Sequence, residues 1–197
     1  FLLITSLLLL IGCTFKSDPI KSVLKEDEFL RKILKDKDSY ELQILYTEVS
    51  KNSVGQAEFS DFQFQVNDEK YFYPASTIKL PITILALSKI NELRAEGSNI
   101  SPKSKIKISL INNNNEIILK DSITSFQNLI ADVFLVSDNS ASNVLIDFIG
   151  YNYFNSSMSN FGFDNTYLNH KFNPDPFVDS SWRISTLDNE IIWSNEN

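Results

Sequence analysis

Two short motifs contain the residues of this sequence that could carry out acyl-transfer chemistry. In the first, Ser76 and Lys79 are three residues apart and precede the apolar run 82–87. If a helix begins near Ser76, Lys79 lies one turn further along on the same face. A hydroxyl nucleophile then stands beside a potential base, close to backbone N–H groups that could stabilise an oxyanion. The same pattern also fits a helix cap followed by a surface lysine.

The second motif is the triplet Ser137-Asp138-Asn139, which lies between two apolar segments further along the chain. Alone it favours a turn between helices, because Ser, Asp and Asn are all common in caps and turns. Following the first motif in this order, it completes a known signature of enzymes with a serine nucleophile.

These motifs resemble those of the class A β-lactamase family, within the penicillin-recognising serine hydrolases. The resemblance runs from about Leu42 to about Pro174. It is most specific in Pro-Ala-Ser-Thr-Ile-Lys-Leu-Pro over residues 74–81 and in Ser-Asp-Asn-Ser-Ala-Ser-Asn over residues 137–143.

The resemblance implies a role for each motif residue. Ser76 would be the acylated nucleophile, and Ser137 would pass a proton to the leaving nitrogen. Asn139 would direct its amide at Lys79 or at a substrate amide, while Asp138 would brace the loop. Lys79 could be the base only when neutral, and lowering a lysine pKa to about 7 costs roughly 4–5 kcal/mol. A helix dipole supplies at most about 2 kcal/mol, so burial or a second cation must contribute, or Lys79 stays charged.

The sequence departs from the family at the glutamate that activates the deacylating water. Residues 161–168 resemble the entry to the loop that carries this glutamate, and counting forward from Thr166 puts its position at Phe172. Alignment on the following proline puts it at Asn173 instead, and neither side chain can act as a general base. Asp175 is the nearest acid, and His170, the only histidine, is expected to be a solvated loop residue.

A second departure concerns the family's third motif, Lys-Thr/Ser-Gly on a late strand, which supplies an oxyanion donor and binds the substrate carboxylate. None of the five glycines follows such a pair, and the chain begins at Phe1 rather than Met. We therefore expect a fragment that lacks the C-terminal strands of the sheet.

The start of the chain predicts export. Residues 1–12 are an apolar run too short to span a bilayer, as in the core of a signal peptide. Residues 10–13 resemble a bacterial lipobox, in which Cys13 would be lipidated and anchor the protein to a membrane of the bacterial cell envelope. An ordinary signal peptide with an incidental cysteine is the alternative. Cys13 is the only cysteine, which excludes an internal disulfide.

Composition is that of a globular protein, with 43% hydrophobic residues among 197 and a formal net charge of −7. The acidic balance and the lack of a basic stripe argue against nucleic acid as a partner.

The expected fold class is α+β, with an antiparallel sheet flanked by helices and an all-helical lobe. Three segments are expected: a signal peptide over 1–13, a tether and first helix over 14–37, and a partial hydrolase domain over 38–197. Within that domain we expect strands over about 41–66 and the helical lobe over about 76–197. Helices are expected at 20–37, 76–96, 125–136, 141–149 and 152–161, with a connector of little regular structure at 98–122, a loop from Asp164 and a helix within 187–197.

The sequence therefore predicts a monomeric serine hydrolase that opens a β-lactam or a peptidoglycan-like amide through an acyl-enzyme on Ser76, as in antibiotic resistance. This chemistry needs neither a metal nor an organic cofactor. One alternative is a penicillin-binding D-alanyl-D-alanine peptidase-like protein with slow deacylation. Another is a non-catalytic envelope lipoprotein of the same fold.

Overall fold

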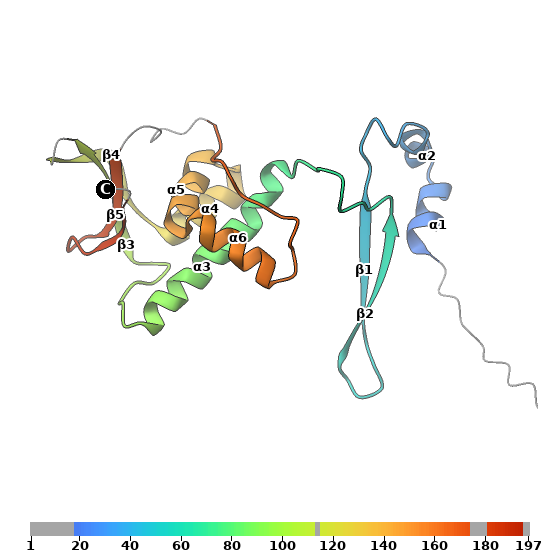
Figure 1. Ribbon diagram of the computed structural model, residues 1–197, viewed down its shortest axis with the longest axis horizontal. Helices are drawn as coiled ribbons and strands as arrows, with labels where there is room; N and C mark the ends of the chain where they lie inside the picture. Colours follow the sequence, from blue (N-terminus) through green and yellow to red (C-terminus); the bar gives the residue numbers. More distant parts are fainter. Residues whose placement is uncertain (1–17, 113–114, 174–180, 195–197) are drawn as a thin grey trace, which may run out of the picture. The chain divides into compact units, whose positions relative to one another are not determined.

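The computed structural model describes residues 18–112, 115–173 and 181–194 of the chain (Figure 1). Contacts divide the chain into two compact units, one ending at Tyr71 and one beginning at Phe72. The expected signal peptide and Cys13, the expected site of lipidation, lie outside the described residues. Within the described part, no helix combines the length and the apolar character needed to cross a membrane.

The first unit begins with two short helices where the apolar pattern predicted one over 20–37. They are α1 (Pro19–Glu26) and α2 (Glu28–Lys35). The single-helix prediction is wrong because Asp27 is extended, with φ −82° and ψ 128°, and its carboxylate accepts from the Leu30 N–H at 2.8 Å. An aspartate that satisfies a free N–H in this way starts a new helix.

The hairpin predicted over about 41–66 is confirmed. Strands β1 (Ile44–Lys51) and β2 (Ala57–Phe64) pair antiparallel, with Ile44 opposite Phe64. The Asn52 side-chain oxygen accepts from Val54 N–H at 3.0 Å and from Gln56 N–H at 2.9 Å, which closes the turn between the strands.

The second unit is built around α5 (Asn139–Ile149), which packs on α3 (Lys79–Ala95), α4 (Phe126–Val136) and α6 (Tyr151–Asn160) (Figure 1). All four helices were expected near these bounds. Phe126 of α4 and Phe148 of α5 are fully buried, with ring centroids 4.5 Å apart. This core fixes the ends of α3, α4 and α5 that carry the sequence motifs.

The same unit contains a four-stranded antiparallel sheet in the order β4-β3-β5-β6. Its strands are β3 (Lys105–Asn112), β4 (Asn115–Ser125), β5 (Ser181–Thr186) and β6 (Ile191–Ser194). The α+β class is therefore correct, whereas three details were wrong: the unstructured connector at 98–122, the helix within 187–197 and the all-helical lobe over 76–197.

The physical reason for these corrections is that alternate apolar side chains of β3 and β5 join the core, although the polar Lys107, Ser109 and Ser185 of these strands are buried as well. Ile106 and Ile108 of β3 are buried, as are Trp182 and Ile184 of β5, and all four join the core formed by the helices. Alternate residues of a strand share one face, so this face of the sheet is held against the helical core. In the tail, Asn189 adopts a positive φ of 66° in the turn that allows β6 to pair back onto β5.

Candidate active site

Ser76 lies in η1 (Ala75–Ile78), a short 3-10 helix that leads into α3. Its side chain is exposed, and the preceding residue, Ala75, has a positive φ of 47°. A non-glycine residue in the left-handed region is strained, and such strain often accompanies functional sites. The first N–H groups of a helical segment lack intrahelical partners, so backbone donors are present beside the Ser76 hydroxyl.

Lys79 is the first residue of α3, and its side chain is directed inward, with only 3% of the residue exposed. Its Nζ donates three hydrogen bonds: to the Ser137 carbonyl oxygen at 2.5 Å, to Ser137 Oγ at 3.1 Å and to Asn139 Oδ1 at 2.7 Å. These contacts join the two sequence motifs directly.

Ser137 is the C-cap of α4 and adopts the left-handed conformation, with φ 55°. Its Oγ donates to Ser76 Oγ at 3.1 Å and accepts from Lys79 Nζ. Ser76, Ser137 and Lys79 therefore form one continuous chain of hydrogen bonds.

The remaining motif residues begin α5. The Asp138 carboxylate accepts from the Ala141 N–H at 2.6 Å and so caps the helix. Of the two partners expected for Asn139, the structure shows the lysine, because Asn139 Oδ1 accepts from Lys79. Its Nδ2 donates to the Asn173 carbonyl oxygen at 2.7 Å and connects the cluster to the loop after α6.

Burial changes the electrostatics of Lys79. Desolvation lowers the pKa of its ammonium below the ordinary value, and the nearby Asp138 carboxylate partly opposes this effect. The Phe172 ring covers the same ammonium, with Nζ 4.7 Å from the ring centroid. The shift is in the direction that a lysine base requires, and its largest cause is burial.

Asn143, which the sequence analysis did not single out, fixes the loop beside the motif residues. It is fully buried on α5, donates to the Phe172 carbonyl oxygen at 2.8 Å and accepts from the Phe172 N–H at 2.8 Å. The available signal was its position four residues after Asn139, which places both amides on the same face of a helix. By this double contact, Phe172 is the loop residue held next to Lys79.

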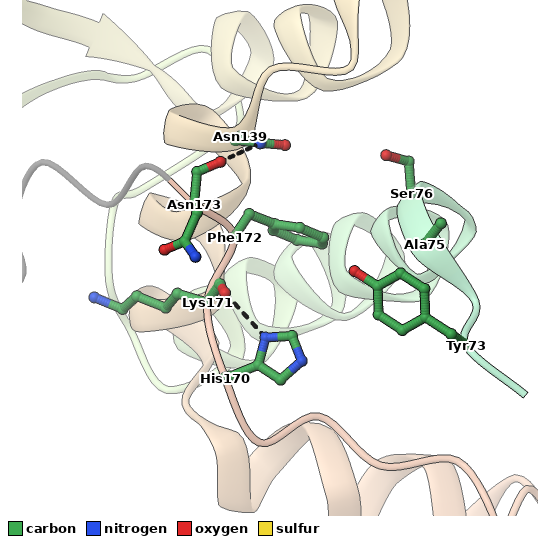
Figure 2. Close-up of a pocket in the computed structure, with 8 residues that line it drawn as sticks. All are labelled: Tyr73, Ala75, Ser76, Asn139, His170, Lys171, Phe172 and Asn173. Carbon is green, nitrogen blue, oxygen red and sulfur yellow. Dashed lines mark hydrogen bonds between the residues drawn. The ribbon is translucent and has the colours of Figure 1, made fainter. Parts of the chain in front are cut away.

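A cavity of about 340 Å³ opens beside this cluster (Figure 2). Residues from the segment before η1, from η1 itself, from the start of α5 and from the loop after α6 form its walls. They are Tyr73, Ala75, Ser76, Asn139, His170, Lys171, Phe172 and Asn173. His170 was expected to be a solvated loop residue; it is exposed, but it also lines the pocket that contains Ser76. Among the described residues, no group of three or more His, Cys, Asp or Glu side chains could hold a metal ion.

Comparison with known proteins agrees with this geometry. Neither the curated proteins nor the solved structures compared give a match. The model of the beta-lactamase enzyme family matches residues 27–190, which include both motifs and every residue that lines the cavity. The chain therefore belongs to the beta-lactamase enzyme family and is a β-lactamase-like serine hydrolase.

Proposed function

We propose that the protein opens a β-lactam or a related amide through an acyl-enzyme on Ser76. The observation that carries this proposal is the continuous chain of hydrogen bonds from Ser76 Oγ through Ser137 Oγ to Lys79 Nζ. Nucleophile, relay and base are at hydrogen-bonding distance before substrate arrives, as general acid–base catalysis requires.

In the acylation step, Ser76 Oγ attacks the amide carbonyl carbon while its proton passes through Ser137 to Lys79. The carbonyl electron pair moves to oxygen, where backbone N–H groups at the start of η1 stabilise it. Collapse of this intermediate breaks the C–N bond, and the proton returns through Ser137 to the leaving nitrogen. Lys79 must be neutral to accept the proton, and burial lowers its pKa in the direction that this step requires.

The residue that covers Lys79 bears on the deacylation step. Phe172 places an apolar ring over Lys79, where a water-activating carboxylate would be needed. The two hydrogen bonds between the Asn143 amide and the Phe172 backbone, one donated and one accepted by Asn143, hold this residue in place. This arrangement supports a second candidate function, a penicillin-binding D-alanyl-D-alanine peptidase-like protein whose acyl-enzyme is hydrolysed slowly. A non-catalytic protein of the same fold would instead bind its ligand reversibly.

The proposal is tested by labelling the full-length protein with a fluorescent penicillin. Wild type should become covalently labelled, whereas Ser76→Ala should not. Ser140→Ala is the matched control, because Ser140 is exposed on α5 and has the same side chain. Equal labelling of Ser76→Ala and wild type would contradict the proposal, and reversible binding alone would favour the non-catalytic alternative.

We also propose that Cys13 carries a lipid anchor to the bacterial cell envelope, on the basis of its lipobox-like sequence. Mass spectrometry of the membrane fraction should detect acylated Cys13, and Cys13→Ala should release the protein from the membrane. Retention of that variant in the membrane would contradict this proposal.

A further inference from the structure

We propose that Asp147 and Lys171 are positioning residues, whose ion pair sets the register of the loop after α6 on α5 and so places Phe172 over Lys79. The pair belongs neither to the two sequence motifs nor to the chain of hydrogen bonds from Ser76 to Lys79. Its consequence for acylation rests on the proposed function, whereas its consequence for the position of the loop does not.

One face of α5 carries polar side chains that contact this loop. Asn139, Asn143 and Asp147 follow one another at intervals of four residues, which places them on successive turns of the same face. They contact residues 171–173 in the opposite order, so the loop runs antiparallel to the helix here. The register between helix and loop therefore decides which loop side chain lies next to Lys79.

The first two contacts are made to the loop backbone. Asn139 Nδ2 donates to the Asn173 carbonyl oxygen at 2.7 Å, and the Asn143 amide donates to and accepts from the Phe172 backbone, each at 2.8 Å. Every residue other than proline offers the same N–H and C=O groups. These contacts anchor the loop, but a slip of one residue would satisfy the same amides and bring Lys171 or Asn173 to the position of Phe172.

The third contact depends on a side chain of the loop. Lys171 Nζ lies 2.5 Å from the Asp147 carboxylate, and these side chains are only 20% and 12% exposed. The same ammonium lies 5.9 Å from the centroid of the Trp182 ring in β5. Figure 2 shows the side chains of Lys171 and Phe172 directed to opposite sides of the loop. A slipped loop would break the ion pair, so the pair selects the register in which Phe172 covers Lys79.

The energetics of a buried ion pair favour a role in positioning over a role in stability. Desolvation of two charges offsets much of their attraction, so a well-packed apolar pair of similar volume is often equally or more stable. A slip that separates the charges is strongly unfavourable, whereas apolar contacts are non-directional and tolerate it. Replacing Asp147 and Lys171 by apolar residues should therefore keep the fold and lose the register.

The test uses the full-length double variant Asp147→Leu/Lys171→Met and benzylpenicillin. In wild type, NMR should show a nuclear Overhauser effect (NOE) between the Phe172 ring and the side chain of Lys79, whose Nζ lies 4.7 Å from the ring centroid. The double variant should melt at or above the wild-type temperature, yet lose this NOE. Its acylation rate per titrated active site should fall by about 10- to 100-fold, because the base loses the ring that covers it.

One further variant and one control separate the ion pair from a general effect of charge. Asp147→Asn removes one charge and keeps the size of the side chain, and it should also lose the NOE and acylate slowly. Asp164→Asn makes the same chemical change in the same loop, at a carboxylate that accepts from Ser159 Oγ and does not line the cavity. This control should behave as wild type in both measurements.

A coupling measurement shows whether the pair acts through Phe172. Because Phe172→Leu removes the ring, adding Asp147→Asn to it should change the acylation rate by less than about twofold. A retained NOE in the double apolar variant, or an equal effect of Asp147→Asn with and without the ring, would overturn the proposal. No acylation of wild type would overturn the proposed function alone, since the NOE would still report the register of the loop.

Discussion

The double contact between Asn143 and Phe172 predicts that Asn143→Ala weakens both the fold and the site. Asn143 is fully buried, and its amide satisfies the N–H and the carbonyl group of Phe172, each at 2.8 Å. Removing the amide leaves both backbone groups without these partners, at the point where the loop lies beside Lys79.

The expected magnitude follows from the cost of losing two buried hydrogen bonds. At about 1–2 kcal/mol for each group left unsatisfied, the free energy of unfolding should fall by about 2–4 kcal/mol. For a chain of this size the melting temperature should drop by roughly 5–15 °C.

The chain provides a matched control in Asn155 of α6. Its Oδ1 accepts from the Leu168 N–H at 2.8 Å and its Nδ2 donates to the Leu168 carbonyl oxygen at 3.1 Å, in the same loop. Asn155→Ala should also lower the melting temperature, but by less, because Asn155 is only partly buried and water can replace its contacts. Leu168 does not line the cavity, so this variant should keep the wild-type rate of penicillin labelling.

Thermal unfolding, amide hydrogen exchange and the labelling rate distinguish the two variants. Asn143→Ala should lose protection from hydrogen exchange at the Phe172 amide, and its rate of penicillin labelling should differ from that of wild type. Asn155→Ala should lose protection from exchange at the Leu168 amide alone. Wild-type melting and wild-type Phe172 protection in Asn143→Ala would refute the conclusion that Asn143 fixes the loop at this position.

Three further predictions follow from the same geometry. Lys79→Met should reduce the acylation rate by about 10²–10⁴-fold. Because the pKa of Lys79 is lowered in the folded protein, the unfolded chain binds this proton more tightly, and the free energy of unfolding of wild type should rise as the pH rises towards 10.5. Lys79→Met should lack this rise. Equal pH–stability curves for the two proteins would contradict this prediction. Phe172→Glu places a carboxylate beside Lys79 and should shorten the lifetime of the acyl-enzyme, followed by mass spectrometry; an unchanged lifetime would count against the inferred position of Phe172. Burial and the hydrogen bond to Glu92 raise the pKa of Tyr153 to about 12, so the wild type should lose stability relative to Tyr153→Phe between about pH 10 and pH 12. Parallel unfolding curves for these two proteins would contradict that shift.

Much of the helical part of the fold could be predicted because it follows from local sequence signals. Ser125 caps α4 through its hydroxyl, which accepts from the Asn128 N–H at 3.1 Å. Gly150 ends α5 with a positive φ of 79°. Such caps act within one turn and can be recognised in a single sequence.

The strands of the second unit depended on partners far away in the sequence. Ile108 of β3 pairs with Ile184 of β5, and nothing local to either residue identifies the other. The alternation over 105–110 was visible, but an isolated strand has no stability of its own. In the tail, the short apolar run 191–193 fits a strand as well as a helix.

The candidate site also contains residues that the sequence identified and residues that it did not. The two motifs identified Ser76, Lys79, Ser137 and Asn139, which the structure brings together in one cluster. The contact between Asn143 and Phe172 and the position of His170 could not be inferred, because each depends on how the loop after α6 returns to α5 and η1.

The most direct test of the central claim is intact mass spectrometry of the full-length protein sampled over time with a penicillin, followed by peptide mapping. Our account predicts that the mass rises by one ligand and that the adduct maps to Ser76. A return to the starting mass would identify a hydrolase that turns over, and a persistent adduct would identify a penicillin-binding protein with slow deacylation. An unchanged mass, or an adduct on a residue other than Ser76, would contradict the claim that Ser76 is the acylated nucleophile.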